Sequence, residues 1–120
     1  MGFLDRLFGK REVTPPAQQP EHAVIVHFEY GSTDLARMHD AERRLQDAIA
    51  EKAAGELDGN EIATDGSDGF FYMYGADADL LFAAVKPVLE SVDFLRGARV
   101  KLRYGRPQEN PRVRELVVGA

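Results

Sequence analysis

Two polar residues on a predicted strand, His27 and Glu29, are the pair in this chain whose types and spacing could perform acid–base chemistry. Side chains two positions apart on a strand point to the same face, so the imidazole and the carboxylate would be neighbours. No nucleophile accompanies them, because Ser32, Ser67 and Ser91 occupy cap, turn and helix-end positions that account for a serine. We therefore interpret the pair as half-exposed polar positions and predict no catalytic residue.

Four acidic residues, Asp58, Glu61, Asp65 and Asp68, follow one another closely and raise the question of a metal site. A calcium-binding EF-hand loop needs oxygen ligands at alternate positions and a closing glutamate. Ile62 occupies one of the alternate positions after Asp58, and no glutamate closes the loop. Since Asp-Gly pairs are also typical of hairpin turns, we predict no metal ion and no other cofactor.

The aromatic run Phe70–Tyr74 partly resembles the third-strand signature of the RNA-recognition motif, in which aromatic side chains stack on bases. Phe70 and Tyr72 would be the stacking residues. However, Asp68 stands where that motif has a basic residue, and Gly75 stands where it has an aromatic one. The net charge of −5 also disfavours a polyanionic partner, so nucleic-acid binding is not expected.

The composition predicts one globular domain. The chain has 120 residues, of which 44% are hydrophobic, enough to bury a single core. It has no cysteine, which excludes disulfides and thiolate chemistry and is typical of a reducing compartment. No apolar run approaches the roughly 20 residues that span a bilayer, and no secretory signal is evident. We therefore expect a cytoplasmic protein.

The first part of the chain differs from the rest. Residues 1–11 predict a short amphipathic helix, and residues 12–22 form a proline-rich linker. A helix of this length is unstable alone in water. It is therefore expected either to pack on the domain or to make a weak contact with a membrane surface. Its apolar side consists of Phe3, Leu4, Leu7 and Phe8.

Residues 23–105 predict the element order strand, helix, strand, strand, helix, strand. Two split βαβ units with this spacing indicate an α+β ferredoxin-like βαββαβ sandwich. Its four-stranded antiparallel sheet would carry both helices on one face and the first and third strands in the middle. The C-terminal tail, residues 106–120, could add an edge strand over Val113–Val118. The predicted strands are Ala23–Tyr30, Glu61–Thr64, Gly69 to Gly75 and Ala98–Tyr104; the predicted helices run from Thr33 or Asp34 to Ala54, where Gly55 ends the first, and from Asp77 to Val92.

Strand alternation predicts which side chains the helices leave uncovered. We expect Phe71 and Met73 to point toward the helices, because the RNA-recognition signature places these positions inward. The predicted binding face of the sheet consists of Ile25, His27, Glu29, Phe70, Tyr72, Tyr74, Lys101 and Arg103. The predicted core includes Val26, Phe28, Leu45, Phe82, Val85 and Leu102.

Several short runs resemble a family of small bacterial proteins that has no assigned activity. They are Asp58–Glu61, Tyr72–Asp79, Phe82 and Lys86–Leu89. The resemblance covers residues 23–105 and implies a ferredoxin-like fold and a bacterial origin. It implies no mechanism and transfers no catalytic residue to this chain.

The sequence thus favours a non-enzymatic module that engages a protein partner or a second copy of itself through the open sheet face. Three wet aromatic side chains would form an unusually large apolar patch on a monomer, so a second copy, the C-terminal Val113–Val118 segment or a partner is expected to cover them. A homodimer is favoured, because a symmetric patch needs no other gene product. The alternative is a small-molecule or weakly enzymatic site on the same face, around His27, Glu29 and Tyr72.

Overall fold

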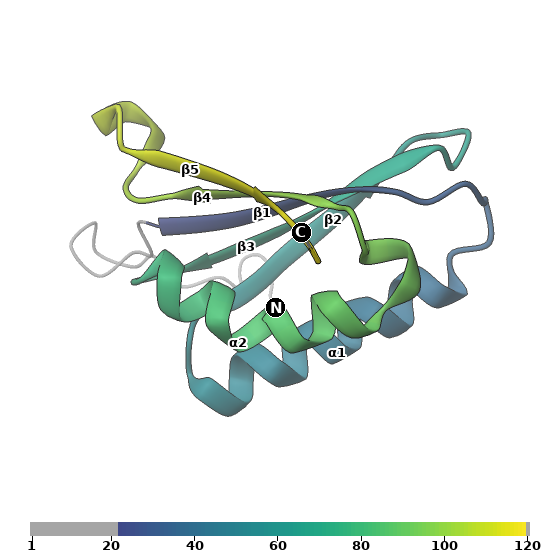
Figure 1. Ribbon diagram of the computed structural model, residues 1–120, viewed down its shortest axis with the longest axis horizontal. Coiled ribbons are helices and arrows are strands. Elements are labelled where there is room, and N and C mark those ends of the chain that lie inside the picture. The colour runs from purple at the N-terminus through teal and green to yellow at the C-terminus, as the bar shows by residue number, and fades with distance from the viewer. Residues whose placement is uncertain (1–21, 120) are drawn as a thin grey trace, which may run out of the picture.

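Five strands form one sheet in the computed structural model, which describes residues 22–119. The predicted N-terminal helix and residues 12–21 of the predicted linker lie outside the described residues. Two helices lie together on one face of the sheet, so the molecule has two layers (Figure 1). The elements are β1 (His22–Glu29), α1 (Ala36–Lys52), β2 (Glu56–Ile62), β3 (Asp68–Gly75), α2 (Ala78–Ser91), the 3-10 turn η2 (Asp93–Leu95), β4 (Arg99–Arg103), the 3-10 turn η3 (Pro107–Glu109) and β5 (Val113–Val117).

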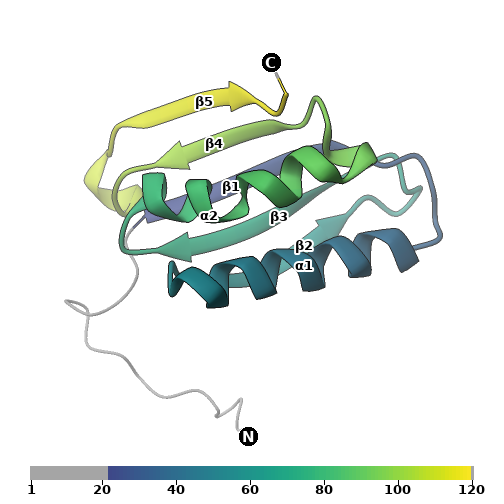
Figure 2. The same cartoon turned by 60° about the horizontal axis from the view of Figure 1, so that its bottom comes forward.

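The strands lie in the order β2-β3-β1-β4-β5, and every neighbouring pair is antiparallel (Figure 2). The first and third strands lie inside the sheet, as predicted. The prediction of four strands is wrong, because β5 pairs with β4 and makes five. The C-terminal segment therefore extends the sheet sideways and does not cross the face opposite the helices.

The core lies between the helices and the inner face of the sheet. Phe71 and Met73 are fully buried there, which confirms their predicted direction. Phe82 was predicted to be in the core but is only partly buried, and Leu81 is fully buried instead. Phe82 lies toward the sheet edge, where it lines a cavity together with Leu116 of β5. The other predicted core residues are all buried: Val26, Phe28, Leu45, Val85 and Leu102.

The ends of α1 differ from the prediction. The helix begins at Ala36, whose N–H donates to Asp34 Oδ1 at 3.0 Å. At the other end, Ala53 and not Gly55 adopts the left-handed conformation, with a φ of 50°. Gly55 is needed for a different reason: a Cβ atom there would lie 2.1 Å from the carbonyl oxygen of Tyr74. The close approach of two chain segments therefore demands this glycine.

The start of α2 is capped as predicted. Asp77 Oδ1 accepts hydrogen bonds from the N–H groups of Asp79 and Leu80, at 3.0 and 3.2 Å. The N–H of Ala78 donates to Nδ1 of His22 at 2.9 Å. Because the first turn of a helix has amides without internal partners, these bonds stabilise it and tie it to β1.

Strand β2 is longer than the sequence predicted, since it begins at Glu56 and not at Glu61. The register against β3 shifts between Leu57 and Gly59, which marks a β-bulge. A bulge inserts an extra residue and interrupts the alternation of side chains along the strand. The interruption hid the first half of β2 from a pattern-based prediction.

Candidate functional site: the open face of the sheet

The face of the sheet opposite the helices carries every predicted binding residue, and we call this surface the open face. In the register, Ile25 lies opposite Tyr72 on one side and opposite Lys101 on the other. Residues that alternate along paired strands share a face, so the register assigns the open face strand by strand. Its members are Glu56, Gly59 and Glu61 on β2; Asp68, Phe70, Tyr72 and Tyr74 on β3; Ala23, Ile25, His27 and Glu29 on β1; Arg99, Lys101 and Arg103 on β4; and Val113, Glu115 and Val117 on β5.

A stack of three rings occupies the middle of the open face. The ring of His27 lies on that of Phe70, with centroids 4.4 Å apart and planes inclined by 12°. Phe70 in turn stacks with Tyr72, with centroids 5.9 Å apart and planes inclined by 13°. All three side chains are half-buried. The mutual stacking holds the rings in place before any partner arrives, which lowers the entropy cost of binding.

His27 has a carboxylate partner that the sequence did not indicate. Its Nε2 lies 2.7 Å from Oδ2 of Asp68, with 29% and 40% of the two side chains exposed. Because an ionised carboxylate can only accept, this nitrogen carries the proton that is shared in the bond. The sequence suggested Glu29 as the neighbour, but Glu29 lies opposite Asp68 in the register and is exposed. Only the register between β1 and β3, two strands that are not consecutive in the chain, could have identified Asp68.

Tyr72 is fixed by a second carboxylate that the sequence also missed. Its hydroxyl donates to Glu61 Oε1 at 2.6 Å. This hydrogen bond, followed by desolvation and the charge of Glu61, raises the pKa of Tyr72 to about 12. The phenol therefore stays protonated across the physiological range and presents a fixed apolar ring with an occupied hydroxyl.

Charge is distributed by strand across the open face. Strand β2 carries acidic side chains, the acidic border, and β4 carries basic ones, the basic border, on opposite sides of the ring stack. Further acidic side chains of this face lie on the other three strands: Glu29, Asp68 and Glu115. Within residues 22–119, Glu56, Arg99 and Lys101 form no ion pair. Arg103 donates from Nε to the carbonyl oxygen of Gly105 at 2.7 Å. The face thus offers an apolar centre between an acidic border and a basic border.

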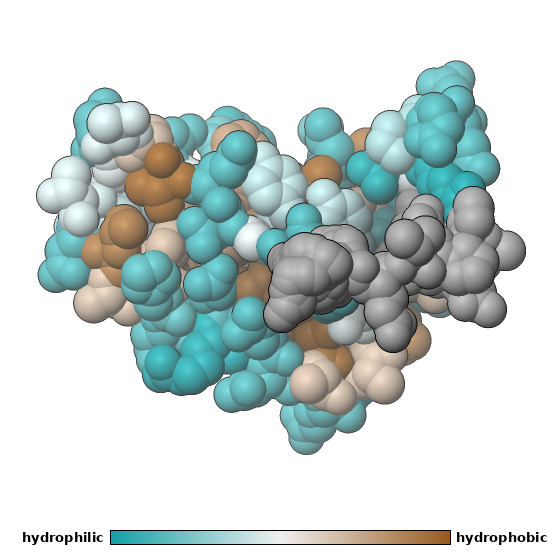
Figure 3. Space-filling view, turned by 180° about the vertical axis from the view of Figure 1, so that it is seen from behind, coloured by the Kyte–Doolittle hydropathy of each residue, from teal (hydrophilic) through white to brown (hydrophobic). Residues whose placement is uncertain are grey.

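Apolar side chains are also exposed at the β5 border. In the part of the chain that the structure describes, the large hydrophobic residues with high exposure are Leu80, Val113 and Val117. The two valines belong to the open face. On the side of the molecule opposite to that of Figure 1, the hydrophobic residues form separate areas divided by hydrophilic ones (Figure 3).

A cavity of about 360 Å³ borders the open face at the end of β1. Its lining includes His27, Glu29 and Arg99 from the sheet, together with Phe94 of η2. It reaches neither the phenyl group nor the phenol of the ring stack. The cavity therefore joins two of the residues predicted for a small-molecule site and leaves out Tyr72.

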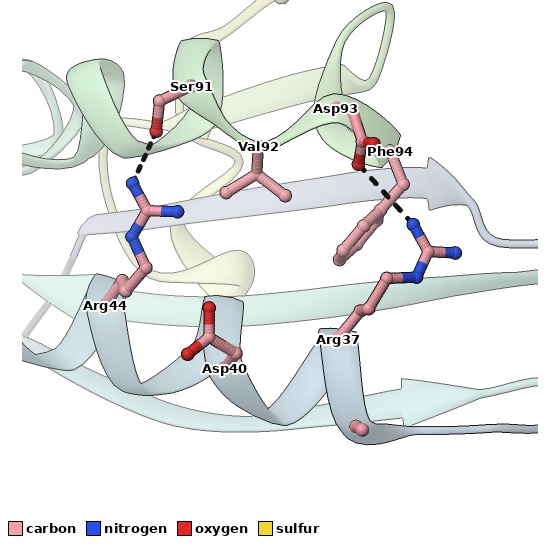
Figure 4. Close-up of a pocket in the computed structure, with 8 residues that line it drawn as sticks. Arg37, Asp40, Arg44, Ser91, Val92, Asp93 and Phe94 are labelled. Carbon is pink, nitrogen blue, oxygen red and sulfur yellow. Dashed lines mark hydrogen bonds and ion pairs between the residues drawn. The ribbon is translucent and has the colours of Figure 1, made fainter.

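A separate groove of about 460 Å³ lies in the helical layer, between α1 and the segment that follows α2 (Figure 4). Arg44 donates to Ser91 Oγ at 2.7 Å, and Arg37 lies 3.5 Å from Asp93 Oδ1. Arg37 also lies over the ring of Phe94, 5.4 Å from its centroid. These arginines connect α1 to the end of α2, so we interpret them as braces between the helices.

Two further observations limit the chemistry. No group of three or more His, Asp or Glu side chains among residues 22–119 is arranged to hold a metal ion. In the same part of the chain, neither α1 nor α2 combines the length and the apolar character that a bilayer crossing requires.

Comparison with protein-family models, with curated proteins and with solved structures found no match. The resemblance to a family of small bacterial proteins stays a prediction, and function has to be inferred from the side chains themselves.

Proposed function

We propose that this protein is a non-enzymatic interaction module whose open face binds another protein surface. The observation that carries the proposal is the stack of His27, Phe70 and Tyr72 on the face that the helices leave uncovered. Aromatic side chains at the centre of a patch, with charged residues at its border, are typical of protein interfaces. We assign a ferredoxin-like arrangement to β1–β4 and the helices, supported by the strand order β2-β3-β1-β4.

The bonding of the polar groups favours binding over catalysis. The hydroxyl of Tyr72 is engaged with Glu61, and its raised pKa makes it a poor proton donor near neutral pH. The imidazole of His27 stacks on Phe70 and bonds to Asp68. Rings held in this way serve better as a contact surface than as groups that move protons.

Photo-crosslinking in the native cells tests the proposal. A photoreactive amino acid replaces Lys101, an exposed member of the open face; the matched control replaces Glu51, an exposed residue of α1. We expect the probe at position 101, and not the one at 51, to form a discrete protein adduct. Tyr72→Glu should abolish that adduct while the circular dichroism spectrum is retained. Equal labelling from both positions, or no adduct from position 101, would contradict the proposal.

The hydrogen bond between His27 and Asp68 favours a second candidate, a small-molecule site on the same face. A carboxylate that orients an imidazole is a common arrangement in ligand sites. Nuclear magnetic resonance of the His27 ring nitrogens during addition of a metabolite mixture tests this function. A saturable shift that Asp68→Asn removes would support it, and unchanged His27 signals would reject it.

A further inference from the structure

We infer that the partner of the open face is a second copy of this chain, packed face to face about a two-fold axis parallel to the strands. The axis passes between β1 and β3. This inference rests on the proposed function, since it names the partner of the same surface. The observation behind it is that the acidic side chains of β2 and the basic side chains of β4 lie on opposite sides of the ring stack, so that each row can meet the other in a second copy.

The direction of the axis follows from the charge distribution. A two-fold axis parallel to the strands reverses the strand order of the second copy, so β1 faces the partner's β3 and β2 faces the partner's β4. The acidic border then meets the basic border twice. An in-plane axis perpendicular to the strands would instead place β2 on β2 and β4 on β4, and like charges would repel.

The register specifies the charge pairs. Four residues of neighbouring strands lie side by side, at the same position along the strand direction: Glu61, Phe70, His27 and Arg99. Rotation about the axis keeps this position, so Glu61 faces the partner's Arg99. By the same register, Glu56 faces the partner's Arg103. Asp68 faces the partner's Glu29, a like-charged pair at the end of the strands in which the Asp68 carboxylate lies 2.7 Å from Nε2 of His27 in its own chain. An axis through β1 itself would place Glu61 against the partner's Val117, which offers no opposite charge.

Side-chain sizes are complementary near the axis. Tyr72 faces the partner's smaller Ile25. Lys101 faces the partner's Gly59, where a Cβ atom would meet nothing within 4 Å. Packed sheets lie about 10 Å apart with interdigitating side chains, so large residues opposite small ones fill this space.

Sedimentation equilibrium of the full chain tests the inference with charge-reversal variants. We expect the wild type to dimerise and both Glu61→Arg and Arg99→Glu to weaken the dimer about tenfold or more, because each creates two repulsive contacts. The double variant E61R/R99E should recover to within about threefold of the wild type. The matched controls, Glu51→Arg and Lys52→Glu, reverse exposed charges at the end of α1, on the other side of the sheet, and should leave the dimer unchanged.

Each of the other outcomes would refute a specific part of the inference. A dimer that survives Tyr72→Glu with the fold intact would place the interface elsewhere. Dimer loss in Tyr72→Glu without recovery in E61R/R99E would refute the axis. A wild type that stays monomeric at roughly millimolar concentration would refute self-association. If the wild type is monomeric, the crosslinking experiment tests the proposed function separately. An adduct between position 101 and a different protein would support an interaction module, and the absence of any adduct would reject both the module and the dimer.

Discussion

Replacing Leu45 by alanine is the most direct test of how α1 packs on the sheet. Leu45 lies in the middle of α1 and is 0% exposed. Alanine keeps the helix intact, because it has the highest helix propensity. The change therefore removes buried apolar contacts and leaves the backbone unchanged.

The expected loss follows from the atoms removed. Three carbon atoms leave the core, which costs about 2–3 kcal/mol at about 0.8 kcal/mol per buried methylene. The cavity left behind adds about 1–2 kcal/mol, since packed neighbours relax only in part. The helix propensity of alanine returns about 0.2 kcal/mol. We expect Leu45→Ala to lower the free energy of unfolding by about 3–5 kcal/mol, a large share of the roughly 5–15 kcal/mol that a domain has.

Urea unfolding followed by circular dichroism measures this loss, with Leu80→Ala as the matched control. Leu80 lies on α2 and is 54% exposed, so its truncation creates no closed cavity and should cost less than about 1 kcal/mol. A loss below about 1 kcal/mol for Leu45→Ala, or equal losses for both variants, would mean that α1 does not pack as described.

Three further predictions follow from the capped helix, the phenol and the N-terminal residues. Glu61→Gln should lower the pKa of Tyr72 from about 12 toward its ordinary value of 10.0, as ultraviolet titration of tyrosinate would show. Because the pKa of Tyr72 is raised in the folded protein, the stability that the Tyr72–Glu61 hydrogen bond contributes is fully present below pH 10.0 and is lost as the pH rises through about 12. A Tyr72 pKa that is unchanged in Glu61→Gln would contradict the role of Glu61. Asp77→Ala should cost about 1 kcal/mol in urea unfolding, whereas Asp47→Ala on the exposed side of α1 should cost less than about 0.3 kcal/mol; similar losses would argue against the cap. Removal of residues 1–20 should change Tm by only a few degrees, and flotation with liposomes should recover less of the truncated form than of the intact chain; a large drop in Tm would show that these residues stabilise the domain.

Residue patterns predicted the direction of side chains within single elements. Alternation in β4 and the signature match in β3 correctly placed Lys101 and Phe71 on opposite faces of the sheet. The cap at Asp77 was predictable because it depends on residues that are adjacent in the chain. In α2, the apolar run from Leu80 to Phe82 left the phase of the helix ambiguous, so the wrong neighbour was placed in the core.

Contacts between elements could not be predicted from the pattern. The partner of Tyr72 depends on the alignment of β2 with β3, which includes the bulge near Gly59. The partner of His27 depends on the alignment of β1 with β3, which are not consecutive in the chain. The sequence suggested that an edge strand could follow Arg106. Its pairing with β4 depends on how the two segments meet in the fold, which the local residue pattern does not specify. The predicted open face was therefore correct in its members and incomplete in the carboxylates that hold them.

The fifth strand also bears on whether the sheet can grow by the addition of strands. Strand β5 pairs only with β4, so its own outer edge carries the unpaired N–H and C=O groups at which strand addition could occur. Its length of five residues and its charged side chains, Arg114 and Glu115, make this edge a poor template for a further strand. At the other edge, the irregular ladder beside Gly59 makes β2 a poor template for the same process. Growth of fibrils by strand addition is thus disfavoured at both ends of the sheet. Association through the open face differs from strand addition, because a two-fold dimer buries the open faces of both copies. No open face is then left to bind a third molecule, so assembly stops at the dimer.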